Sequence, residues 1–461
     1  MQLTSLCLGA SLWSVSVARA LPGSSPGIQR RTASTTGADV ITTLTNIAHD
    51  PSIAGTNTSE KAAAIATKLS EIISTKAATL SSVESAFAII EGVFSDRPAD
   101  IAEAAWDIVS SGLIPSSIVN FLNGYFDSDL NSVDNVNPRS PETPIYPFKA
   151  PGDAPYSVAE DSLRAAIQIP ASFSYGANGE KPLILVPGTA APAGTTYYFS
   201  FSKLGKAAAN ADPVWVNIPS ASLGDAQVNA EYVAYAINYI SSISTSNVSV
   251  ISWSQGGLNT QWALKYWPST RAVVEDFIPI SPDFHGTILA NPLCPGFPTL
   301  ACTPSVWQQK YNSEFISTIR AEDGDSAYVP TTTLYSSWDE VVQPMDGDSA
   351  SAYLSDARGV GVTNNQVQTI CPGKPAGGVY THEGMLYNPL SWALAIDAIN
   401  HEGPGDPSRL DLDEVCGQLI PPQLGLDDVL GTEGVVVVAL AEILGYGPPA
   451  LGEPPLKRYA Q

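Results

Sequence analysis

The stretch Val248-Ser249-Val250-Ile251-Ser252-Trp253-Ser254-Gln255-Gly256-Gly257-Leu258 decides the fold class. Its first part has the composition of a buried strand, and the residues up to Tyr266 follow a helical pattern. A strand, a tight turn and a helix therefore meet at Ser254, where the turn exposes the hydroxyl and the helix N-terminus supplies positive potential. Ser252 stands where the motif G-x-S-x-G has its first glycine. The stretch predicts a nucleophilic serine, and the alternative is an ordinary strand-to-helix turn with a serine N-cap.

The sequence around this turn predicts an α/β fold. Apolar, β-branched runs alternate with helical segments such as 226–243, which is typical of βαβ units and a mostly parallel sheet with helices on both faces. The clearest runs lie at 183–186, 214–216, 248–251 and 331–335. We expect residues 156–461 to form one α/β-hydrolase domain.

The N-terminal part has a different character. Residues 1–20 contain a short apolar stretch followed by Ala18-Arg19-Ala20, which predicts a signal peptide rather than a membrane span. Residues 21–130 predict an all-helical region, with helices near 83–93, 101–109 and 118–125 and a processing site at Arg31. Six prolines in residues 131–155 predict a linker. The helical region is a folding chaperone segment, a lid or an inert cap.

Charge and cysteine content point to secretion and exclude several partners. The 45 acidic residues against 22 Lys plus Arg give a net charge of −23, which disfavours nucleic acid and anionic membranes. After loss of Cys7 with the signal peptide, four cysteines remain, Cys294, Cys302, Cys371 and Cys416, which suits two disulfides. Sequons begin at Asn57 and Asn247. No metal-ligand spacing occurs, and two Asp-Gly-Asp turns lack the distal glutamate of a calcium loop. We expect no metal or cofactor and a secreted, extracellular monomer.

The position of Ser254 limits where its partners lie. In α/β-hydrolases the chain order is Ser, Asp or Glu, then His, and only His285, His382 and His401 follow Ser254. His285 leaves no room for an acid loop, and His401 ends a helix, where its cation complements the dipole. His382 remains, in a glycine-rich loop. The acid needs a loop after a strand, and Asp339 follows the run at 331–335, with Glu340 as its competitor, more often a solvated charge.

The run Val250-Ile251-Ser252-Trp253-Ser254-Gln255-Gly256-Gly257-Leu258 resembles the Candida antarctica lipase B-like family of α/β-hydrolases, which are secreted fungal lipases and esterases. The resemblance runs from about Leu163 to about Leu444 and includes Lys181-Pro182-Leu183-Ile184-Leu185-Val186-Pro187-Gly188-Thr189 and Pro282-Asp283-Phe284-His285-Gly286-Thr287. It assigns the catalytic base to His382 and the acid to Asp339. One departure is Thr381, which replaces an aspartate before the base.

The resemblance and the fold also imply an oxyanion hole and a pocket. The backbone N–H groups of Gln255 and Thr189 would bind the oxyanion, with the Thr189 hydroxyl as a third donor. Ala190 replaces the glycine that follows in the family. The implied pocket residues are Trp253, Asp283, Gln309, Val341 and Val342, with core packing or buried hydrogen bonding as the alternative for each.

The cysteines fit the same resemblance. Cys371 with Cys416 matches a family disulfide that brackets the His382 loop. Cys294 with Cys302 would close residues 291–303 into a stapled loop that stiffens one flank of the cleft, which predicts little activation at lipid interfaces. Two other family disulfides have no cysteines here, so the tail after Leu444 is expected to be less constrained, and the helix near 435–440 is expected to cover the pocket entrance.

Hydrolysis of carboxylic esters, acylglycerols or similar lipids, is therefore the leading hypothesis, with an ester or lipid as substrate and transient contact with a lipid interface. Acyl transfer or amide cleavage by the same triad is the second hypothesis. The third is a non-catalytic binding protein with a hydrolase fold, and such proteins typically lack a triad residue.

Overall fold

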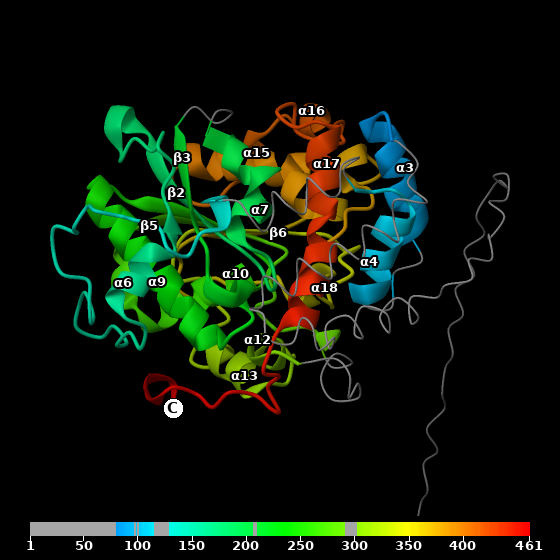
Figure 1. The fold of residues 1–461 in the computed structure, drawn as a ribbon. Helices are drawn as coiled ribbons and strands as arrows, with labels where there is room; N and C mark the ends of the chain where they lie inside the picture. Colours follow the sequence, from blue (N-terminus) through cyan, green and yellow to red (C-terminus); the bar gives the residue numbers. More distant parts are fainter. Residues whose placement is uncertain (1–79, 96–97, 99–100, 115–128, 206–209, 291–301) are drawn as a thin grey trace, which may run out of the picture. The chain divides into compact units, whose positions relative to one another are not determined.

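Seven strands form one sheet in the order β1-β3-β2-β4-β5-β6-β7 (Figure 1). This computed structural model describes residues 80–95, 98, 101–114, 129–205, 210–290 and 302–461, and all of them belong to one compact unit, residues 37–461. Strands β2 to β7 are parallel, and β1 pairs antiparallel with β3. The strands are β1 (Ile167–Gln168), β2 (Lys181–Val186), β3 (Ala211–Val216), β4 (Val248–Trp253), β5 (Val274–Ile280), β6 (Thr331–Tyr335) and β7 (Val362–Gln366).

Helices connect these strands and cover both faces of the sheet. Those before β4 are α3 (Val83–Phe94), α4 (Ile101–Ser110), α6 (Glu160–Ala165), α7 (Ala193–Tyr198) and α9 (Ala226–Ser244). After β4 come α10 (Gln255–Tyr266), α12 (Pro304–Gln308), α13 (Glu314–Arg320), α14 (Val367–Ile370), α15 (Pro389–Asn400), α16 (Leu412–Cys416), α17 (Leu426–Glu433) and α18 (Val435–Gly445).

The two faces of the sheet bury separate hydrophobic clusters. Because side chains alternate along a strand, Leu183 and Leu185 of β2 enter one cluster, whereas Ile184 and Val186 enter the other. The first cluster includes apolar residues of α7, α15, α17 and α18. The second includes α9, α10 and α13. A strand that is apolar on both faces is typical of a parallel sheet, and β4 is buried along its whole length.

Helices α3 and α4 pack on the same core as the sheet. They lie beside α17 and α18 in Figure 1, and Ile90 and Ile108 are fully buried in the cluster that contains Leu185. Both helices match the ranges expected from the sequence. The expected helix at 118–125 and everything before residue 80, including the signal peptide, Arg31 and Asn57, lie outside the described residues.

The proline-rich segment 131–155 has little regular structure but is attached to the sheet domain. Ile145 is fully buried, and the N–H of Ala154 donates to the carbonyl oxygen of Tyr266 at 2.8 Å. The division of the chain into a helical region, a linker and a catalytic domain stays a prediction. No helix among the described residues is long and apolar enough to span a bilayer.

The C-terminal tail is held in place without a disulfide, contrary to the expectation of a less constrained tail. The side chain of Glu453 accepts hydrogen bonds from the N–H groups of Glu314 and Phe315, at the start of α13. Tyr459 packs on Trp267 with ring centroids 5.6 Å apart, and its hydroxyl accepts from the Trp262 indole N–H at 3.2 Å. Edge-on and tilted aromatic contacts and hydrogen bonds to the start of α13 therefore attach the tail.

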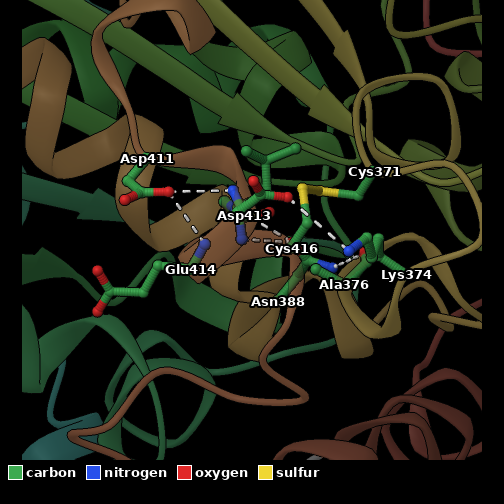
Figure 2. Close-up of a disulfide and its surroundings, with 10 residues drawn as sticks. Cys371, Lys374, Ala376, Asn388, Asp411, Asp413, Glu414 and Cys416 are labelled. Atoms are coloured by element: carbon green, nitrogen blue, oxygen red, sulfur yellow. Dashed lines mark hydrogen bonds and ion pairs between the residues drawn. A yellow bond between two sulfur atoms is a disulfide. The ribbon is translucent and has the colours of Figure 1, made fainter.

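A disulfide joins Cys371, directly after α14, to Cys416 at the end of α16 (Figure 2). Around it, Lys374 forms an ion pair with Asp413 at 3.8 Å, and the Asn388 amide donates to the carbonyl oxygen of Ala376 at 2.8 Å. This is the pairing that the family resemblance implies. Cys302 is disulfide-bonded as well, and Cys294, its expected partner, lies outside the described residues.

Candidate active site

Ser254 lies in a strained turn between the central strand and a helix. β4 ends at Trp253 and α10 begins at Gln255, and Ser254 itself has φ 54° and ψ −132°. Such a conformation is costly for a residue with a side chain and is typical of functional positions. Gly256 permits the turn, because a methyl group there would lie 2.7 Å from the carbonyl oxygen of Pro187. The sequence therefore fixes a sharp elbow that presents the Ser254 hydroxyl.

His382 and Asp339 form a buried pair beside this elbow. Nδ1 of His382 lies 2.7 Å from Oδ2 of Asp339, and their side chains are 2% and 0% exposed. Oδ1 of Asp339 accepts hydrogen bonds from the N–H groups of Val341 and Val342, at 3.0 and 2.6 Å. The carboxylate is therefore held in one orientation by the loop after β6.

The other imidazole nitrogen of His382 faces the reaction side. Nε2 is buried and has no hydrogen-bond partner among the described residues, and His382 and Ser254 line the same pocket. Burial lowers the pKa of His382, but the charge and hydrogen bond of Asp339 outweigh it and raise the pKa overall. A base that is free at Nε2 and strengthened at Nδ1 is suited to accept a proton from a neighbouring hydroxyl.

Thr189 and Gln255 provide the candidate oxyanion donors. Their backbone N–H groups have no hydrogen-bond partner among the described residues. The Thr189 hydroxyl lies 2.7 Å from Oε1 of Gln255 and 2.9 Å from Oε1 of Gln309, so its one hydrogen is donated to one of these two amide oxygens. To act as a third donor to the oxyanion, the Thr189 hydroxyl would have to break its hydrogen bond to the amide oxygen.

Ala190, where the family has glycine, adopts a left-handed backbone conformation. Its φ is 58°, a region that favours glycine, and its N–H donates to the carbonyl oxygen of Ala221 at 2.7 Å. The opposing residues Ser220, Ala221 and Ser222 also have positive φ. The loop that presents Thr189 is thus held against a second strained segment.

The pocket around Ser254 has a volume of about 730 Å³, its open mouth included. Of the expected pocket residues, Trp253, Gln309, Val341 and Val342 line it. Asp283 does not line it and is fully buried, and burial raises the pKa of this carboxyl to about 7. The sequence reasoning missed the other lining residues, which are Ile101, Thr287, Leu289, Ala290, Val306, Glu340, Glu383, Ala439 and Ile443.

One of the missed groups comes from an unexpected part of the chain, and another lies on a helix that was expected at the pocket entrance. Ile101 begins α4, in the helical region before the expected domain boundary, and no local pattern marks it as a pocket residue. Ala439 and Ile443 belong to α18, the helix expected to cover the pocket entrance. Glu340 is only 4% exposed, so the expectation of a solvated charge was wrong. It is buried because its carboxylate accepts the backbone N–H of His382 at 2.9 Å.

The remaining histidines have other surroundings. His401, directly after α15, is half exposed and lies 3.0 Å from Oδ1 of Asp397, in keeping with its expected role at a helix end. For His285, burial lowers the pKa to about 4.

The sequon residue Asn247 is exposed, and its amide donates to Glu275 at 3.2 Å.

Comparison with known proteins settles the family. No protein-family model matches the chain. Lipase B of Pseudozyma antarctica is 34% identical over 322 residues, which cover 67% of this chain and 85% of that protein. This chain belongs to the lipase B family. The crystal structure of Aspergillus fumigatus lipase B is 62% identical to this member of the family, with a TM-score of 0.84, and covers 92% of this chain and 100% of that one. The predictions of an α/β-hydrolase fold and of an ester hydrolase are thereby confirmed.

Proposed function

We propose that this lipase B family member is a secreted serine lipase or carboxylesterase, with Ser254 as nucleophile, His382 as base and Asp339 as acid. The observation that carries the proposal is the buried 2.7 Å contact between His382 Nδ1 and Asp339 Oδ2, in the pocket that Ser254 lines. The names of its relatives, lipase B in both cases, support acylglycerols or similar esters as substrates.

In acylation, Oγ of Ser254 attacks the ester carbonyl carbon while Nε2 of His382 takes the hydroxyl proton. Asp339 stabilises the imidazolium that forms, and it stays ionised itself. The negative charge on the carbonyl oxygen is bound by the N–H groups of Thr189 and Gln255, each worth on the order of 3 kcal/mol in the transition state. The imidazolium then gives its proton to the leaving alcohol, and Ser254 keeps the acyl group.

In deacylation, water takes the place of the alcohol. His382 removes a proton from the water as its oxygen attacks the acyl carbon, and the same N–H groups bind the second oxyanion. Collapse of this intermediate returns the proton to Ser254 and releases a carboxylic acid. The enzyme ends in its starting state, and an alcohol in place of water would give acyl transfer by the same steps.

The lining of the pocket favours an uncharged, apolar acyl or alcohol group. Most of its described residues are apolar, among them Leu289, Val306 and Ile443, and none is Lys or Arg. A cation is therefore absent from the described wall, so the pocket offers no partner for a negatively charged substrate. Neutral esters with hydrocarbon chains fit this lining best.

The deciding experiment is labelling with a fluorophosphonate, followed by mass spectrometry of the adduct. We expect one adduct, on Ser254, and loss of both labelling and p-nitrophenyl ester hydrolysis in Ser254→Ala. Full hydrolysis by that variant would overturn the proposal. A series of p-nitrophenyl esters of increasing chain length then distinguishes a lipase from a short-chain esterase, and activity restricted to amides would favour amide cleavage.

Secretion is part of the same proposal. It is supported by the apolar segment in residues 1–20, by the Cys371–Cys416 disulfide and by the exposed sequon at Asn247. Expression in a fungal host should give a protein in the medium that lacks residues 1–20 and loses mass on treatment with an endoglycosidase. Retention of the whole chain in the cell would contradict this part.

A further inference from the structure

Three buried carboxyl groups lie near the candidate base, and two of them, Glu340 and Glu383, also line the pocket. Glu340 follows Asp339, Glu383 follows His382, and Glu433 ends α17, and their exposed fractions are 4%, 2% and 0%. No described Lys or Arg forms an ion pair with any of them. Buried carboxylates without a cation are costly unless they are hydrogen-bonded or protonated. The three carboxyl groups therefore need hydrogen bonds or bound protons to remain buried.

Hydrogen bonds connect the cluster to the loop that carries His382. Oε2 of Glu340 accepts the backbone N–H of His382 at 2.9 Å. Oε1 of Glu433 accepts from the hydroxyls of Thr381 and Tyr387, at 2.8 and 2.5 Å. The backbone of His382 and the side chain of the preceding Thr381 are thus held by carboxyl groups, and none of these bonds involves the imidazole ring.

Burial and mutual repulsion disfavour a negative charge on all three groups. Burial, followed by the charges of Glu340 and Glu433, raises the pKa of Glu383 well above its usual range. Burial also raises the pKa of Glu433, to about 7. For Glu340, burial and the charge of Asp339 raise the pKa overall, although His382 and a side-chain interaction with Glu383 counteract this, whereas the pKa of Glu383 is raised well above its usual range. A proton is therefore retained most readily on Glu383.

The geometry identifies Glu340 as the group that keeps a charge. Its Oε2 faces an N–H donor, and its Oε1 is buried without a hydrogen-bond partner among the described residues. That oxygen is the available acceptor for a proton on Glu383, whose carboxyl interacts with Glu340. The other titratable groups around the pair are Asp339, Asp283, His382, Glu433 and the buried phenol of Tyr387.

We propose that Glu340 and Glu383 are a positioning pair for His382: Glu383 holds a proton towards Glu340, and the charge kept on Glu340 supplements Asp339 in stabilising the imidazolium. The inference rests on the proposed function, because it takes His382 to be the base. No proton leaves the pair during the reaction, so it acts only through the position and protonation of His382.

The test measures the rate constant for inactivation by a fluorophosphonate as a function of pH. In Glu340→Gln a negative charge near the imidazolium is lost, so we expect the acid limb of the profile to move to lower pH and the plateau rate to fall about tenfold. Glu383→Gln keeps a donor towards Glu340 and should leave the acid limb in place. Glu383→Ala removes the donor, so Glu340 takes up a proton and the limb should move as in Glu340→Gln.

A matched control uses another buried carboxyl group. Asp276 lies near the start of β5, is 2% exposed and accepts from the Ser249 hydroxyl at 2.9 Å. Asp276→Asn should leave the acid limb where it is in the wild type. An unshifted limb in folded Glu340→Gln, or equal shifts in Glu383→Gln and Glu383→Ala, would overturn the inference. Failure of the wild type to label at Ser254 would instead overturn the proposed function, and the inference with it.

A second measurement does not depend on activity. Infrared difference spectra of the wild type against Glu383→Gln at neutral pH should show loss of the carbonyl stretch of a protonated carboxyl group. An unchanged band would mean that Glu383 holds no proton and would overturn the inference, even if Glu340→Gln fails to fold.

Discussion

The indole N–H of Trp253 donates a hydrogen bond to the backbone carbonyl oxygen of His382 at 3.1 Å, and the two rings are 4.9 Å apart. Trp253 is the last residue of β4 and precedes Ser254. The strand that positions Ser254, the proposed nucleophile, therefore also contacts the loop that carries His382, the proposed base. The contact links the surroundings of Ser254 and His382, whose residue numbers differ by 128.

Trp253→Phe tests this link. The variant keeps an aromatic wall but leaves a buried carbonyl oxygen unpaired, so we expect kcat/KM for a p-nitrophenyl ester to fall about tenfold and the melting temperature to fall by several degrees. Trp262→Phe is the control, since it loses a similar bond, to Tyr459, away from the site. It should lose stability while kcat stays as in the wild type. Equal kcat/KM in Trp253→Phe and the wild type would contradict the link.

Asp339→Asn tests the acid. An amide at this position would donate to Nδ1 of His382 and leave Nε2 protonated, so the base would be lost. We expect kcat to fall on the order of 10³–10⁴-fold with little loss of stability. The chain offers a matched pair in Asp397 and His401, 3.0 Å apart, and Asp397→Asn should leave kcat unchanged. Retention of more than a tenth of the activity in Asp339→Asn would exclude Asp339 as the acid.

Gly256→Ala tests the elbow. The added methyl group would lie 2.7 Å from the carbonyl oxygen of Pro187, so strand and helix must separate. We expect the free energy of unfolding to fall by about 1–3 kcal/mol and ester hydrolysis to fall with it. Gly92 lies on the exposed side of α3, where the methyl group of an alanine would meet no atom of a neighbouring element within 4 Å. Gly92→Ala should instead stabilise the protein by about 0.5–1 kcal/mol, and denaturation curves in urea compare the two directly.

Glu442 of α18 predicts a pH dependence of stability. It is 4% exposed, and burial raises its pKa from 4.5 to about 8. The folded state therefore binds a proton that the unfolded state releases, so this contribution is fully present below pH 4.5 and is lost as the pH rises to about 8. In this window the wild type should lose about 1.4 kcal/mol of unfolding free energy per pH unit through this group, and Glu442→Gln should remove that loss. Glu91→Gln, on the surface of α3, should reproduce the wild-type slope, and parallel curves for Glu442→Gln and the wild type would contradict the prediction.

The Cys371–Cys416 disulfide should stabilise the base loop. It closes a loop with a sequence separation of 45, so replacing both cysteines by serine should lower the free energy of unfolding by about 3–4 kcal/mol. Because His382 lies within this loop, ester hydrolysis should lose its thermal stability in parallel. Dithiothreitol would also reduce the disulfide of Cys302, so the double-serine variant is the specific test, and an unchanged melting temperature in that variant would refute the prediction.

The sequence predicted the parts of the molecule that follow from local patterns. The strands at 183–186, 214–216, 248–251 and 331–335 all occur within β2, β3, β4 and β6, because buried parallel strands are marked by continuous apolar residues. β7 was not predicted. It reads Val-Thr-Asn-Asn-Gln, lies at the edge of the sheet and is only partly buried, so it lacks that pattern.

In the candidate site, too, some residues were predictable from sequence patterns and others were not. Ser254, Asp339 and His382 come from loops whose order along the chain restricts them, whereas Glu340, Glu383 and Ile101 reach the pocket through tertiary packing. A glutamate is normally expected at the surface. Only the backbone N–H of His382, brought to Glu340 across 42 positions of sequence, explains its burial. A contact between residues far apart in the chain leaves no periodic pattern in the sequence, so the sequence alone does not reveal it.

The attachment of the C-terminal tail determines how the enzyme carries mechanical load. Tyr459 contacts Trp262 and Tyr266, both on α10, and α10 begins at the residue after Ser254. A force applied at Gln461, for example through a surface linker or a fused protein, is therefore transmitted along α10 to the turn at Ser254. The contact between Trp253 and His382 passes part of this load to the loop of His382, which the Cys371–Cys416 disulfide restrains.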